Sequence, residues 1–138
     1  MDAPERYEQL IAFLGAHLTN ERHELADGSL QFVGGDPPEV VALVEENSVA
    51  IYAYAGVWSP TRGVTPRPRR VGLLKWRRLP ETALFNALGV LIKGAREARL
   101  ASFRTCQECG RSTPPEWMDA DQTCRTCSDR LRREDVVH

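Results

Sequence analysis

The sequence lacks the features that mark membrane-spanning and exported proteins. None of its apolar runs approaches the roughly 18 residues that a transmembrane helix needs, so we expect no membrane partner. Residues 1–6 are polar and acidic, whereas a signal peptide begins with basic residues and continues with an apolar stretch. The composition, 42% hydrophobic and 27% charged, is that of a globular protein. We therefore expect an intracellular, cytoplasmic protein.

Histidine is scarce, and its positions argue against catalysis. The three histidines are His17, His23 and His138, and none of them neighbours a cysteine. A nuclease built on a zinc finger would need histidine in the finger. A metal nuclease of the restriction type would need clustered carboxylates and a lysine on neighbouring strands, and Asp36, Glu45 and Lys75 are poorly spaced for that role. We therefore expect no catalytic residues and no enzyme.

Cysteine is rare as well, but the cysteines that are present are regularly spaced. They form two Cys-x-x-Cys pairs separated by residues 110–123: Cys106, Cys109, Cys124 and Cys127. In a reducing compartment, four thiolates at this spacing supply the tetrahedral ligands of one structural Zn²⁺ and leave no open position for catalysis. The alternatives are two disulfides in a secreted protein or a thioredoxin-like redox pair, although neither pair lies in a βαβ pattern. We predict one structural zinc ion.

The residues that follow each pair indicate how the finger folds. Gly110 comes directly after the first pair, where a turn that points N–H groups at the sulfurs often needs a positive φ. Residues 128–135, after the second pair, have helix-forming character. A turn with two ligands, a connecting segment and a helix carrying the other two ligands make a treble clef. We predict such a finger as a separate module over residues 104–138.

The finger segment resembles the GATA-type zinc finger. The resemblance consists of Cys-x-x-Cys-Gly at 106–110, Pro115-x-Trp117 and Cys-x-x-Cys at 124–127, and it covers residues 106–133. It implies a zinc finger with four cysteine ligands, with Trp117 as its hydrophobic plug. The loop between the pairs is shorter than in the family, and residues 118–121 replace its basic residues. Similar fingers in bacterial regulators bind RNA polymerase, so the resemblance leaves the partner open.

The net charge of −1 hides a segregation along the chain. Residues 1–57 carry ten acids and two bases, and residues 58–104 carry eleven bases and two acids. A positive segment attracts phosphates. We predict DNA or RNA contacts from the long helix and from Arg62, Arg67, Arg69, Arg70, Lys75, Arg77 and Arg78. The alternatives are a solvated hairpin loop and a homodimer in which the acidic and basic segments pair.

The periodicity of apolar residues predicts an α+β domain over residues 1–103. We expect a helix at 4–18, an antiparallel meander of about four strands at 30–33, 40–45, 49–58 and 71–79, and a long helix at 80–103. Residues 19–23 are predicted as a connector and residues 59–70 as a mobile loop. Both helices should lie on one face of the sheet, which leaves the other face open or covered by a partner.

Two further predictions concern side chains of this domain. Tyr52, Tyr54 and Trp76 form either a stacking platform for bases or part of the core. Lys93, Arg96 and Arg99 lie on the more polar side of the long helix.

Together these patterns predict a small zinc-finger protein that binds nucleic acid, as a regulator of transcription or of another DNA transaction. The alternative is a protein-interaction module that docks on RNA polymerase or another protein. The acidic first 57 residues favour the alternative, because they would repel a nucleic acid approaching from that side.

Overall fold

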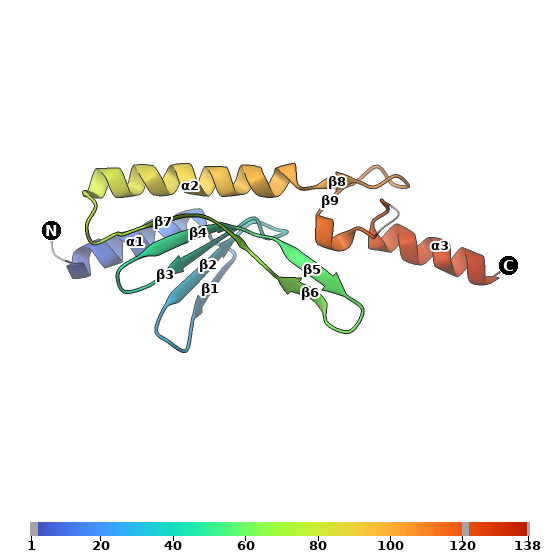
Figure 1. The fold of residues 1–138 in the computed structure, drawn as a ribbon, viewed down its shortest axis with the longest axis horizontal. Coiled ribbons are helices and arrows are strands. Elements are labelled where there is room, and N and C mark those ends of the chain that lie inside the picture. The colour runs from blue at the N-terminus through green and yellow to red at the C-terminus, as the bar shows by residue number, and fades with distance from the viewer. Residues whose placement is uncertain (1–2, 120–121, 138) are drawn as a thin grey trace.

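A computed structural model describes the backbone of residues 3–119 and 122–137 and the side chains of residues 4–119 and 122–131. The chain folds as a mixed α+β structure whose long second helix leads directly into the cysteine-containing finger (Figure 1). The helical elements are α1 (Ala3–His17), α2 (Glu81–Ala101), the short 3₁₀ helix η1 (Pro115–Trp117) and α3 (Arg125–Val137). None of the helices in the described part of the chain has the length and apolarity needed to cross a bilayer.

The predicted meander is present as a five-stranded antiparallel sheet in the order β1-β2-β3-β4-β7. Its strands are β1 (Glu21–Glu24), β2 (Leu30–Gly34), β3 (Val40–Val44), β4 (Val49–Ala53) and β7 (Arg69–Leu74). A separate hairpin of β5 (Gly56–Ser59) and β6 (Gly63–Pro66) connects β4 to β7 and projects beyond the end of the sheet (Figure 1).

One face of the sheet packs on both long helices, as predicted. Alternate residues of the strands meet the apolar stripes of α1 and α2, because side chains alternate along a strand and repeat about every 3.6 residues along a helix. The core contains Leu10, Leu14 and Leu18 from α1, Leu84, Leu88, Ile92 and Ala95 from α2, and Phe32, Val40, Ala42, Val44, Val49 and Ile51 from the sheet. This packing fixes α2 across β3, β4 and β7 and directs its C-terminal end toward the finger.

The structure corrects the predicted boundaries at four places. The predicted strand 71–79 ends at Leu74, where β7 ends, and the chain continues as a turn. β1 lies in the predicted connector, where its four exposed residues pair through the backbone and leave no apolar pattern to detect. The predicted strand 49–58 is divided into β4 and β5. The predicted loop 59–70 contains β6 and the start of β7. A tight turn joins β5 to β6, and Gly63, the first residue of β6, has a φ of 69°.

Candidate metal centre and basic surface

The four cysteines lie together in a hairpin-then-helix arrangement. Strand β8 (Arg104–Thr105) pairs with β9 (Ser112–Thr113), and the turn between them carries Cys106 and Cys109. Cys124 directly precedes α3, and Cys127 lies in its first turn. The four sulfur atoms all lie within 4.8 Å of one another, and those of Cys109 and Cys124 are 3.9 Å apart.

These distances suit one tetrahedral metal ion. Bonds of about 2.3 Å from zinc to thiolate would place the sulfurs about 3.8 Å apart. Gly110 has a φ of 71°, and its N–H donates to the carbonyl of Cys106 at 2.9 Å, which confirms the predicted turn. The N–H of Cys124 donates to the sulfur of Cys106 at 3.2 Å. The cluster could therefore hold one metal ion as a preformed, N–H-supported site.

Two of the cysteines differ in acidity because their surroundings differ. N–H groups of Cys109 and Cys124 lower the pKa of the Cys106 thiol to about 6, since they stabilise its thiolate. Hydrogen bonding to Cys124, with desolvation, raises the pKa of Cys127 to about 12. Cys106, Cys124 and Cys127 are buried, whereas Cys109 is exposed. A divalent cation at the centre would supply the positive charge that lets all four sulfurs ionise.

The finger is joined to the α+β domain by a buried ion pair between Arg99 of α2 and Glu116 of η1. Arg99 is 2% exposed and Glu116 is 4% exposed. The guanidinium of Arg99 donates to both carboxylate oxygens, through Nη1 at 3.1 Å and through Nη2, and its Nε donates to the carbonyl of Pro38 at 2.9 Å. The rings of Tyr54 and Phe103 flank the guanidinium, each with its centroid 4.9 Å from Cζ. Arg99 therefore ties the sheet, α2 and the finger together at one point.

Sequence reasoning placed Arg99 on the polar side of the helix, and this prediction is wrong. Arg99 continues the buried stripe of α2, which consists of Leu84, Leu88, Ile92, Ala95 and Arg99. That spacing of three and four residues was the signal that could have identified it. Nothing in the sequence indicated its partner, because Glu116 lies in the short segment between the two cysteine pairs.

A second contact supports the same junction from the β5–β6 hairpin. The guanidinium of Arg125 lies over the ring of Trp58 in β5, with Cζ 3.4 Å from the ring centroid. Strand β5 also contacts η1, and a Cβ atom added to Gly56 would lie 3.3 Å from Cβ of Glu116. The same Cβ atom would lie 2.9 Å from Cγ1 of Val64 in β6, so glycine at position 56 leaves room for Val64 as well as for the finger.

Within the finger, Asp119 has a structural role. Its carboxylate accepts hydrogen bonds from the hydroxyl of Thr123 at 3.0 Å and from the hydroxyl of Ser128 in α3. Asp119 thus ties the segment before Cys124 to the first turn of the helix.

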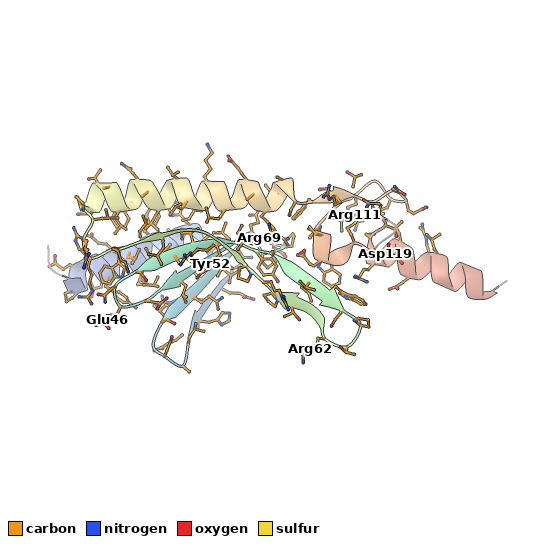
Figure 2. All side chains as sticks on the ribbon, viewed as in Figure 1. Glu46, Tyr52, Arg62, Arg69, Arg111 and Asp119 are labelled. Atoms are coloured by element: carbon orange, nitrogen blue, oxygen red, sulfur yellow. The ribbon has the colours of Figure 1, made fainter. Side chains whose placement is uncertain are left out.

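The seven cations predicted to bind nucleic acid are all exposed, and none forms an ion pair with another described residue. They follow β7, an edge strand of the sheet, and the adjoining hairpin. They fall into two groups instead of one patch. Arg62, Arg67, Arg69 and Arg70 lie on the hairpin and at the start of β7 (Figure 2 labels Arg62 and Arg69), and Lys75, Arg77 and Arg78 follow its end. Four residues of β7 lie between Arg70 and Lys75, and at about 3.4 Å per step the two are about 17 Å apart along the extended chain.

The cations of α2 are less available than the sequence suggested. Nε of Arg96 pairs with Oε1 of Glu39 at 3.2 Å, and Arg99 is buried in the junction. Lys93 is exposed. Arg96 and Arg99 therefore connect α2 to the loop before β3 and to the finger, and the buried guanidinium of Arg99 is not accessible to a phosphate.

The predicted stacking platform does not form. Trp76 is 1% exposed, lies in the core with its ring centroid 5.8 Å from that of Tyr7, and donates its indole N–H to the carbonyl of Glu45. Tyr54 packs on Arg99, and Tyr52 is half-buried on the opposite sheet face from Trp76. The interpretation of Trp76 as a core residue is the right one. Trp117, expected as the plug of the finger, is 47% exposed, because η1 turns Glu116 inward instead.

Comparison of the chain with protein-family models, with curated proteins and with solved structures found no match. The metal centre therefore rests on the geometry of the four cysteines, and the likeness to GATA-type fingers rests on the motif alone.

Proposed function

We propose that this chain is a zinc-stabilised protein that binds DNA or RNA through the cations of the β7 edge and the β5–β6 hairpin. The observation that carries the proposal is the exposure of all seven side chains, with no ion pair to an acidic side chain among the described residues. Arginine and lysine held in this way can neutralise phosphates without first breaking an ion pair. A role in transcription or in another DNA transaction follows from such binding.

Zinc is the metal that the finger suits best. Four thiolates in a tetrahedral arrangement are the ligands of structural zinc sites, and such sites contribute directly to the folding of small modules. In this chain the metal would hold the hairpin of β8 and β9 against α3. That would keep η1, and with it Glu116, in place against Arg99. The metal would then position the finger beside the basic hairpin and take no part in chemistry.

The test measures binding of short labelled oligonucleotides by fluorescence anisotropy, with single-stranded DNA, duplex DNA and RNA compared at several salt concentrations. We expect the logarithm of the binding constant to fall linearly with the logarithm of salt concentration, by about 0.9 per phosphate contacted on duplex DNA. The R62A/R67A variant, which removes two exposed cations of the hairpin and of the segment that follows it, should bind more weakly, and its slope should be shallower by about 2.

The matched control is R104A/R130A, which removes the same charge from exposed positions on β8 and α3. It should leave both affinity and slope close to those of the wild type. Equal losses from the two double variants, or binding that does not depend on salt, would contradict the proposal.

A second candidate function, docking on RNA polymerase or another protein, is favoured by the exposure of Trp117. This side chain lies at a groove of the finger lined by Arg111, Thr113, Pro114 and Arg125. Exposed tryptophan beside arginine is typical of the residues that dominate protein interfaces. A pull-down with tagged protein from nuclease-treated extract should retain a partner with the wild type and lose it with Trp117→Ala if docking is the function.

A further inference from the structure

The sheet has a second face, which no helix of the described chain covers. α1 and α2 pack on the opposite face, and the β5–β6 hairpin and the finger lie beyond the end of the sheet (Figure 1). We call this second face the outer face. The strand pairing arranges its side chains in two rows across all five strands: Glu21, Val33, Val41, Tyr52 and Arg70, and next to it His23, Gln31, Leu43, Ala50 and Leu73.

The centre of the outer face is apolar, although no helix of the described chain covers it. Val41 and Ala50 are buried among their neighbours, Leu43 and Tyr52 are half-buried, and Leu73 is 39% exposed. An antiparallel sheet that is solvated on one face normally alternates apolar with polar residues. This sheet instead presents apolar residues on both faces, which is the pattern of a sheet covered on both sides.

The two borders of the outer face carry opposite charge. Glu21 ends one row at β1, and Arg70 ends the same row at β7. Three strands lie between Glu21 and Arg70, so these two side chains of one chain do not form an ion pair with each other. Among the described residues, Glu21 forms a salt bridge with His23 alone, whose Nε2 lies 3.3 Å from the Glu21 carboxylate. A partner for this face therefore needs an apolar centre, a positive charge that meets Glu21 at the β1 border and a negative charge that meets Arg70 at the β7 border.

A second copy of this chain has that pattern. A two-fold axis parallel to the strands, passing by β3, turns one outer face onto the other and places β1 of each copy over β7 of its partner. The first row of one copy then lies over the first row of the other copy, in reverse order. Glu21 lies opposite Arg70, Val33 opposite Tyr52, and Val41 opposite Val41. A two-fold axis perpendicular to the strands would place β1 over β1 and like charges together, so complementarity selects the first arrangement.

Nucleic acid fits the outer face less well. The central side chains are aliphatic apart from Tyr52, and bases stack on aromatic rings. Glu21 would also repel a phosphate backbone at one border. The cations that remain for nucleic acid are those on the hairpin and beyond the end of β7, outside the rows.

We propose that the outer face is the interface of a symmetric homodimer in which two sheets pack face to face with β1 over β7. Strand spacing of about 4.8 Å and a rise of about 3.4 Å per residue give a face of roughly 20 Å by 17 Å. Two such faces bury less area than the roughly 1,600 Å² of a standard stable interface. The dimer is therefore weak and forms as the concentration rises through the micromolar range.

The experiment is sedimentation velocity from about 1 to 500 μM, on protein freed of nucleic acid and checked by its ultraviolet absorbance ratio. The chain has a mass of 15.5 kDa, and we expect the average mass to rise toward twice that value. Leu73→Glu places a charge in the apolar row and should weaken association about tenfold or more. Val90→Glu, at a side chain of α2 that is 70% exposed, is the matched control and should change nothing. Circular dichroism checks that each variant is folded.

Charge reversal tests the orientation of the two copies. Glu21→Arg alone and Arg70→Glu alone should each weaken self-association, because each puts like charges together at both borders. A mixture of the two single variants should associate again, because every contact between unlike copies then joins opposite charges. A monomer at all concentrations overturns the proposal, as does association unaffected by Leu73→Glu. Oligonucleotide binding that Leu73→Glu abolishes would assign the outer face to nucleic acid instead.

Discussion

The α+β domain and the finger are stabilised by different interactions. Among the described residues, sixteen buried side chains form the core between the sheet and the two long helices. The buried cluster of the finger consists of Cys106, Cys124 and Cys127, with Met118 packed against it. A large apolar core can hold a domain without a metal, whereas a module as small as the finger cannot bury enough apolar surface by itself. We therefore expect metal loss to unfold the finger, and truncation of a core side chain to destabilise the α+β domain.

The largest expected effect is that of metal removal. A chelator such as EDTA, or the substitution Cys127→Ser, should unfold the finger and leave the sheet folded, because structural metal binding is coupled to folding of the module that provides the ligands. Limited proteolysis should then cleave beyond residue 103, while the circular dichroism of the sheet persists. Elemental analysis should find one zinc per untreated chain. Simultaneous unfolding of both regions would show that the contrast is wrong.

Substitution of Glu116 should show how strongly the two regions depend on each other. Glu116→Ala leaves the guanidinium of Arg99 buried without its carboxylate, which costs about 3–5 kcal/mol in buried pairs of this kind. Denaturant unfolding monitored by circular dichroism measures the loss. Glu39→Gln, which breaks the half-exposed pair with Arg96, is the control and should cost less than about 1 kcal/mol. Similar losses from both variants would mean that the junction contributes little.

Truncation of the core should affect the α+β domain while sparing the metal centre. Leu88 is fully buried in α2, and Leu88→Ala should destabilise the domain by about 2–5 kcal/mol through lost contacts and a cavity. Zinc content should stay at one per chain. Val90→Ala, two residues away on the exposed side of the same helix, should change the free energy of unfolding by less than about 0.5 kcal/mol.

The smallest effect concerns pH and the turn between β1 and β2. The N–H and hydroxyl of Ser29 donate to the carboxylate of Asp27 and lower its pKa below 3.8. Because the folded pKa is the lower one, this stabilisation is present above pH 3.8 and is lost as the pH falls through the folded value. Nuclear magnetic resonance titration of Asp27 should show the lowered pKa, and Ser29→Ala should return it toward 3.8. An unchanged titration curve in that variant would contradict the assignment.

The sequence predicted most strongly where a pattern is local. The apolar stripe of α2, the alternation in β4, the turn at Gly110 and the clustering of the four cysteines all follow from spacing, and the structure confirms them. Strand β1 was missed because it consists of exposed, charged residues that pair through backbone groups alone. Trp117 was wrongly placed because aromatic character indicates burial only when the fold turns that residue inward.

By itself the sequence determined the α+β class and a group of four thiols with the spacing of a metal site. These depend on hydrophobic periodicity and ligand spacing, which act over a few residues. Only the tertiary structure decided that Arg99 and Glu116 form a buried pair, that the exposed cations separate into two groups along β7, and that an apolar sheet face ends in opposite charges. Each of these joins residues distant in the chain, and the packing of α2 across the sheet brings the first pair together.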